Sequence, residues 1–141
     1  FELHPTDFAL LQQTFQSFGR QVKTEMTDGF DGLKSCLPPP TKRGVVLIDP
    51  PYELKEDYQR VVRCIQDSLK RFATGTYLIW YPLLQRPEPV DMLKQLHMLE
   101  VKEWLDVQLM VQRPNANGMG MYGSGMFVVN PPWQLPAQLK Q

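Results

Sequence analysis

Residues 49–52 read "DPPY" and bring an acid, two prolines and an aromatic ring together directly after the apolar run "GVVLI". Proline has a fixed φ and no backbone N–H, so the two prolines stiffen the chain and leave their carbonyl oxygens as acceptors. The carboxylate of Asp49 and the carbonyl of Pro50 can then accept the two hydrogens of an exocyclic amine, while the ring of Tyr52 stacks on the attached base. These residue types in this order are suited to methylation of an amino nitrogen.

The chemistry of such a methylation explains why two fixed acceptors would be useful. An adenine amine is a poor nucleophile because its lone pair is delocalised into the ring. Orienting it towards a methyl donor lowers the barrier by several kcal/mol, up to about 7 to 11 kcal/mol in the best cases. The attacking nitrogen must afterwards lose a proton, for which Asp49 is the nearest candidate acceptor. The base must also leave its stack, and stacking on Tyr52 would offset roughly 1 to 3 kcal/mol of that cost.

The place of "DPPY" in the chain favours this functional interpretation. In open α/β sheets, ligands bind outside the carboxyl ends of the strands, and "DPPY" follows a buried strand and precedes a helical pattern. The structural alternative is a turn that merely ends the strand, with Asp49 capping the next helix.

Two other strings resemble functional motifs. "NPPW" at 130–133 has the form of an amino-methyltransferase signature, but it follows a strand that we expect to be the second arm of a hairpin. Its carboxyl end would then lie at the edge opposite the crevice, so we interpret it as structural. "GMGMYG" at 118–123 matches the dinucleotide fingerprint literally, but a strand follows it where the fingerprint needs a helix. We expect this loop to overhang the crevice, with Arg113 and Tyr122 as substrate contacts.

The elements that position these residues alternate between helical and extended patterns. Helical spacing and capping residues predict helices over 6–19, 28–37, 56–72 and 88–100. Apolar runs rich in branched residues predict buried strands over 43–48 and 75–84, and we expect a short strand around 21–26. The alternating stretch 104–112 predicts a half-exposed strand near the sheet edge, paired with a last strand at 126–130. The sequence therefore predicts one α/β domain over residues 1–141 without a second domain.

Composition sets further limits. The chain has 141 residues, and its 15 basic and 15 acidic side chains cancel, so net charge gives no reason to expect a polyanionic partner. Cys36 and Cys64, like His4 and His97, are too isolated to suggest a metal or redox site. No apolar run is long enough to span a bilayer, and no signal peptide opens the chain. We expect a cytoplasmic monomer that binds neither metal nor membrane.

Several strings taken together resemble one family. "ELHP", "DGF", "RGVVLIDPPYE", "YQRVV", "KRFATGTYLIWYP" and "SGMFVVNPPW", in this order, are similar to the RlmJ (YhiR) family of bacterial large-subunit ribosomal RNA adenine N6-methyltransferases. The resemblance implies S-adenosylmethionine as cofactor and a Rossmann-like methyltransferase sheet that ends in an antiparallel hairpin. It implies Asp49 as proton acceptor or amine ligand, with Pro50 and Tyr52 beside it.

The resemblance also implies cofactor contacts near the start of the chain. It places Glu2 at the end of the family's second strand, where an acid holds the ribose hydroxyls, and two carboxylate oxygens suit a diol. Asp28 and Gly29 match the contact to the adenine end of the cofactor. Without the resemblance, a frayed terminal acid and a helix-start turn are the simpler interpretations of these residues.

The chain departs from the family at its start, because the first strand and its Gly-rich loop are absent. We therefore expect a partial methyltransferase domain, from the second strand onward, that leaves strand edges unpaired. Made alone, it would bind S-adenosylmethionine weakly and tend to aggregate. For the whole protein we expect large-subunit ribosomal RNA, naked or in an assembly intermediate, as partner. Two alternatives stay open: a protein of DNA binding or external DNA catabolism without methyl transfer, and an adenine methyltransferase acting on DNA.

Overall fold

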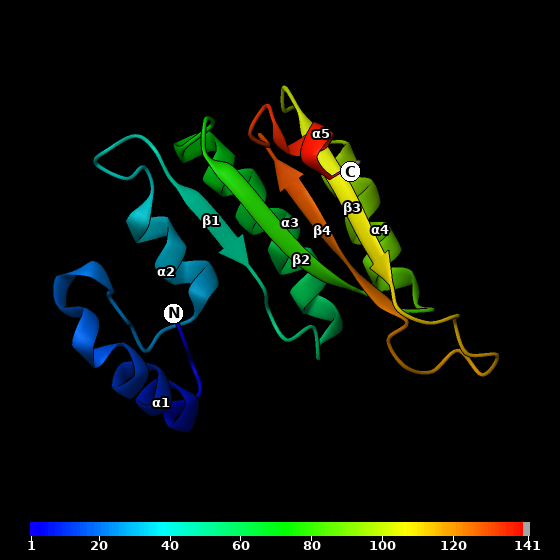
Figure 1. Ribbon diagram of the computed structural model, residues 1–141, viewed down its shortest axis with the longest axis horizontal. Coiled ribbons are helices and arrows are strands. Elements are labelled where there is room, and N and C mark those ends of the chain that lie inside the picture. Colours follow the sequence, from blue (N-terminus) through cyan, green and yellow to red (C-terminus); the bar gives the residue numbers. More distant parts are fainter. Residues whose placement is uncertain (140–141) are drawn as a thin grey trace. The chain divides into compact units, whose positions relative to one another are not determined.

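The computed structural model describes residues 1–139 and divides the chain into two compact units, Phe1–Leu37 and Pro38–Gln141 (Figure 1). The first unit holds helix α1 (Pro5–Phe15), the 3-10 helix η1 (Gln16–Gln21) and helix α2 (Gly29–Cys36). The helices predicted over 6–19 and 28–37 are thus confirmed, although Gly19 lies at φ 55° inside η1.

The prediction of a short strand around 21–26 is wrong. Residues 22–28 are irregular, and the residue expected at a strand end, Glu2, also lies in an irregular stretch. One backbone hydrogen bond joins the two stretches, from the Glu2 amide to the Glu25 carbonyl at 3.2 Å. A strand is defined by a ladder of such bonds, and a single bond does not make one.

The second unit has an α/β fold, with helices packed on a four-stranded mixed sheet. Its elements are β1 (Val45–Ile48), α3 (Lys55–Arg71), β2 (Thr76–Leu83), α4 (Pro87–His97), β3 (Trp104–Met110), β4 (Gly123–Val129) and α5 (Leu135–Gln138). The strand order is β1-β2-β4-β3. Strand β1 runs parallel to β2, while β4 runs antiparallel to both β2 and β3, so the predicted hairpin is confirmed.

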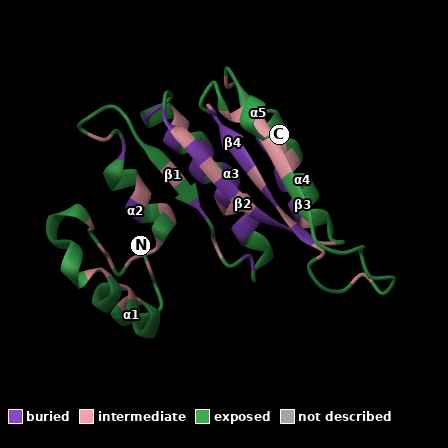
Figure 2. Cartoon of the chain, viewed as in Figure 1, coloured by how far each residue is buried: buried purple, intermediate pink, exposed green. Residues whose placement is uncertain are grey.

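One face of this sheet carries the core. Helices α3 and α4 cover that face, and buried residues gather between the helices and β2 and β4 (Figure 2). The side chains of Tyr77, Ile79 and Phe127 have no exposed surface, and neither have Ile65 of α3 and Leu96 of α4. Burying a large apolar side chain contributes about 1.5 to 3 kcal/mol, so this burial holds the helices against the sheet.

The strand β1 lies at one edge of the sheet and is much less covered. Val45 and Leu47 keep 67% and 63% of their surface exposed, in contrast to the strand buried on both faces that the sequence predicts. The physical reason is the face on which they lie: their β2 partners Thr76 and Leu78 are only half-buried, whereas Tyr77 and Ile79 on the other face are buried.

The register decides which loops share an edge. Ile48 at the end of β1 pairs with Ile79, and Leu83 at the end of β2 pairs with Gly123 at the start of β4. The loop after β1, the segment after β2 and the loop between β3 and β4 therefore lie at the same edge of the sheet (Figure 1). We call this the carboxyl edge. Among the described residues, no helix has the length and apolar character needed to cross a membrane.

Candidate active site

The loop after β1 places the acid of "DPPY" at the carboxyl edge with its side chain accessible. Asp49 is exposed and Pro50 half-buried, whereas Tyr52 is only 6% exposed. Tyr52 has a φ of 54°, in the left-handed region that aromatic residues rarely adopt. Its hydroxyl donates to the carbonyl of Trp80 at 2.7 Å and lies 4.0 Å from the Met92 sulfur.

Aromatic packing keeps the Tyr52 ring inside. Its centroid lies 4.7 Å from that of Tyr58 and 6.2 Å from that of Trp80. Burial raises the pKa of the Tyr52 hydroxyl far above its usual value of 10, and the nearby Tyr58 and Asp49 add to this rise, so the phenol stays a neutral donor. The ring therefore anchors the loop. A stacking surface for a base, which the sequence suggested, is not exposed in this conformation because both its ring and its hydroxyl are engaged in the core.

The start of α3 holds the far end of the same loop. Helix α3 begins at Lys55, and the carboxylate of Asp57 accepts a hydrogen bond from the Leu54 amide at 3.3 Å. Asp57, and not Asp49, thus stabilises this helix start, so the capping role considered for Asp49 belongs to another acid. The Lys55 ammonium pairs with Glu88 Oε1 at 2.7 Å, which ties α3 to the first turn of α4 and lowers the pKa of Glu88.

The loop between β3 and β4 reaches the carboxyl edge as expected. The Tyr122 amide donates to the Leu83 carbonyl at 3.1 Å, and the Tyr122 carbonyl accepts from the amides of Val111 and Gln112. Tyr122 is half-buried and Arg113 is exposed. The glycine-rich string leads into β4 and not into a helix, so it has no dinucleotide-fingerprint context.

"NPPW" lies at the opposite edge, where β2 begins. The side-chain Nδ2 of Asn130 donates to the backbone carbonyls of Ala73 and Gly75, both at 2.8 Å. The backbone carbonyl of Asn130 accepts from the Thr76 hydroxyl at 2.9 Å. Because β4 is antiparallel to β2, this placement confirms that the string lies at the edge opposite Asp49, and its structural role stays a prediction.

The expected cofactor residues belong to the first unit. Glu2 Oε1 accepts from the His4 amide at 2.8 Å, and Asp28 Oδ1 accepts from the Phe30 amide at 2.9 Å as the N-cap of α2. A Cβ built on Gly29 would lie 3.6 Å from the Phe1 Cβ. Phe1 thus packs on the first turn of α2 and brings the neighbouring Glu2 close to the Asp28–Gly29 turn.

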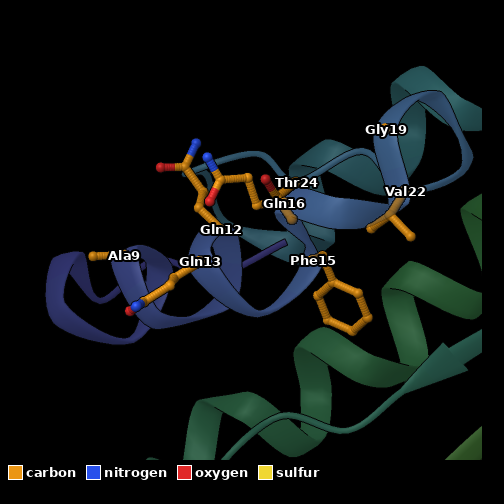
Figure 3. Close-up of a pocket in the computed structure, with 8 residues that line it drawn as sticks. All are labelled: Ala9, Gln12, Gln13, Phe15, Gln16, Gly19, Val22 and Thr24. Carbon is orange, nitrogen blue, oxygen red and sulfur yellow. The ribbon is translucent and has the colours of Figure 1, made fainter.

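The first unit also has an open hollow of about 500 Å³ (Figure 3). Its lining side chains are uncharged and come from α1, η1 and the segment after η1: Ala9, Gln12, Gln13, Phe15, Gln16, Gly19, Val22 and Thr24. It contains neither the expected cofactor residues nor any residue of "DPPY". Within residues 1–139, no group of three or more His, Cys, Asp or Glu side chains is placed to hold a metal ion.

Comparisons with known proteins place this geometry in context. The Ribosomal RNA large subunit methyltransferase J proteins of Haemophilus influenzae and Escherichia coli are each 46% identical to the chain, over 140 and 138 residues. These matches cover 99% and 98% of the chain and 49% of each relative, so the chain spans about half the length of the curated relatives it matches.

Solved structures share the fold. The crystal structure of protein LPL1258 from Legionella pneumophila is 34% identical, with a TM-score of 0.88 over 99% of this chain and 51% of that one. Precorrin 8W decarboxylase, the product of gene MT0146 of Methanobacterium thermoautotrophicum, is 17% identical with a TM-score of 0.52, over 91% of this chain and 66% of that one, a likeness of fold alone. The family model described as Ribosomal RNA large subunit methyltransferase D, RlmJ, matches residues 1–141, so the chain belongs to the RlmJ family.

Proposed function

We propose that the whole protein transfers a methyl group from S-adenosylmethionine to the exocyclic N6 amine of an adenine in large-subunit ribosomal RNA. The observation that carries this proposal is the exposed Asp49 at the carboxyl edge, on a loop held at both ends. The Tyr52 hydroxyl fixes one part of the loop on β2, and the Lys55–Glu88 pair fixes its end on α4. The names of the relatives from Haemophilus influenzae and Escherichia coli support the reaction class and the RNA.

The catalytic residues act by orientation and proton transfer. The Asp49 carboxylate and the Pro50 carbonyl accept hydrogen bonds from the target amine and aim its nitrogen at the methyl donor. Transfer of the methyl group, with loss of its bond to the sulfonium, would leave the amine cationic, and the amine would lose a proton that Asp49 accepts or passes to water. Tyr52 serves as a positioning residue, since its anchored side chain holds Asp49 and Pro50 in place.

The cofactor residues fit a ribose and an adenine. Bound S-adenosylmethionine would supply a methyl group activated by a sulfonium. Glu2 would offer Oε2 to a ribose hydroxyl while Oε1 holds the His4 amide, and the Asp28–Gly29 turn would face the adenine end. The contact of Phe1 with Gly29 supports a shared site for these three residues.

The exposed edge strand supports a larger sheet in the whole protein. Among the described strands β1 pairs with β2 alone, and each curated relative is about twice as long as its match to this chain. We propose that a further strand pairs with β1 and completes a Rossmann-like methyltransferase sheet, with residues 1–141 as part of that domain.

The test is transfer of labelled methyl to unmodified ribosomal RNA by the whole protein and two variants. Asp49→Ala removes the acceptor and should abolish transfer while RNA affinity is kept, since phosphate affinity depends on cations. Glu53→Ala is the matched control, because Glu53 is an exposed acid on the same loop. A DNA oligonucleotide with the same sequence tests the polymer. Equal activity of Asp49→Ala and the parent would refute the proposed role, and transfer to DNA alone would change the substrate.

A further inference from the structure

The loop between β3 and β4 exposes methionines within a segment of the chain that is nearly free of charge. From residue 107 to residue 139, Arg113 is the only charged side chain in the sequence. Met119 is 67% exposed and Met121 is 48% exposed. Exposed apolar side chains gathered on one loop mark a contact with another molecule more often than scattered ones do.

The polar side chains of this loop bind the backbone of the two methionines. Asn115 Nδ2 donates to the Met119 carbonyl at 2.8 Å, and the Met119 amide donates to Asn117 Oδ1 at 3.1 Å. Gln112 Nε2 donates to the Met121 carbonyl at 2.9 Å. These three amides hold the backbone, so the methionine side chains are presented by an internally bonded loop.

Two glycines form a tight turn around Met119. Gly118 has a φ of 72° and Gly120 a φ of 87°, both in the left-handed region where other residues are strained. A Cβ on Gly118 would lie 3.9 Å from Gln85 Oε1, so the turn lies beside the segment that follows β2. Met119 therefore stands at the tip of the turn, at the same edge of the sheet as Asp49.

We propose that Met119 contacts a nucleobase next to the target adenine and takes up part of the stacking lost when that adenine leaves its stack. The proposal rests on the function proposed above, because it places the RNA at the carboxyl edge. A thioether is polarisable and packs well against aromatic rings, and methionine is one of the side chains that proteins insert between bases. With one cation, the loop offers little to phosphates, which favours contact with the bases.

The test compares whole-protein variants in methyl transfer to a naked ribosomal RNA fragment over a range of salt concentrations. Met119→Ala should lower kcat/KM about twofold to tenfold, as expected for a methionine–ring contact, and leave the salt dependence unchanged. Met119→Leu should retain most of the rate. Met98→Ala is the matched control, because Met98 is 81% exposed at the end of α4 and should have no effect. Arg113→Ala should reduce the salt slope by about 0.7, the value of one phosphate contact on a single strand.

A second readout does not depend on activity. The RNA carries 2-aminopurine beside the target adenine, and its fluorescence is measured with the parent and with Met119→Ala in the absence of cofactor. Binding of the parent should change the probe's stacking, and Met119→Ala should diminish that change. Equal behaviour of Met119→Ala and Met98→Ala in both assays would overturn the proposal. An effect confined to particles containing ribosomal proteins would overturn it in favour of a protein contact. If the parent itself transfers no methyl, the proposed function fails and the role of Met119 fails with it, whereas an active parent with an unaffected Met119→Ala variant overturns the role of Met119 alone.

Discussion

Asn130 offers a sharp test of whether "NPPW" is a structural corner, because its backbone and its side chain make separable contributions. Its φ is 51°, and asparagine tolerates this left-handed conformation better than alanine does. Its side chain donates two hydrogen bonds, to Ala73 and Gly75, one exposed and one partly buried. We expect replacement to lower stability while the chemistry at the opposite edge of the sheet remains.

The magnitudes follow from these two contributions. Asn130→Ala loses two hydrogen bonds, each contributing about 0.5 to 1.5 kcal/mol, and adds about 1 kcal/mol of backbone strain. The free energy of unfolding should therefore fall by about 2 to 4 kcal/mol. Asn130→Gly loses the same bonds without the strain, so it should be about 1 kcal/mol more stable than Asn130→Ala, although glycine usually destabilises. Asn130→Asp places a carboxylate against two carbonyl oxygens and should be the least stable.

The assay is urea unfolding of the whole protein at neutral pH, with methyl transfer measured below the unfolding transition. The three variants should rank Gly, Ala, Asp in decreasing stability, and Asn130→Gly should keep the parent's kcat. A kcat reduced a hundredfold in a stably folded Asn130→Gly would refute the reasoning and make "NPPW" catalytic. Equal stability of the alanine and glycine variants would refute the strain argument.

Two further predictions concern the sheet. Burial raises the pKa of Tyr77 to about 12. The pKa of Tyr77 in the folded protein exceeds the unfolded value of about 10, so its contribution to stability is fully present below pH 10 and is lost as the pH rises towards 12. Urea unfolding should show that the parent loses stability between about pH 9 and about pH 11. Tyr77→Phe should lose about 1 kcal/mol less than the parent over the same range. Gly125→Ala would place a Cβ against the buried ring and hydroxyl of Tyr81, whose hydroxyl is hydrogen-bonded to Asp106 and Gln108. The free energy of unfolding, measured by thermal unfolding, should fall by about 1 to 3 kcal/mol or more. Gly44→Ala, whose Cβ would lie 3.5 Å from Pro39, is its control, and an equal loss in both would contradict the steric argument.

The local sequence patterns predicted those features that depend on the residues of one element or of two neighbouring elements. The apolar stripe of α3, including Val61, Val62 and Ile65, predicted the buried face that the structure shows. The alternation over 104–112 and the glycine-rich loop predicted the β3–β4 hairpin, and its antiparallel direction correctly set "NPPW" apart from "DPPY". Spacing alone supports such predictions because helical and extended periodicities differ, and because a tight loop reverses the chain.

Other features depended on contacts between distant residues. The short strand expected at 21–26 is absent because only one backbone bond meets it. Val45 and Leu47 of β1 are exposed because they lie on the less covered face of the sheet, with Thr76 and Leu78. The sequence determined that an acid follows a strand at Asp49 and that a glycine-rich loop precedes the last strand. Only the tertiary structure decided that Tyr52 is an anchor, since its burial depends on Trp80 and Met92, 28 and 40 residues further along the chain. Burial and hydrogen-bond partners arise from the packing of distant segments, which no local pattern specifies.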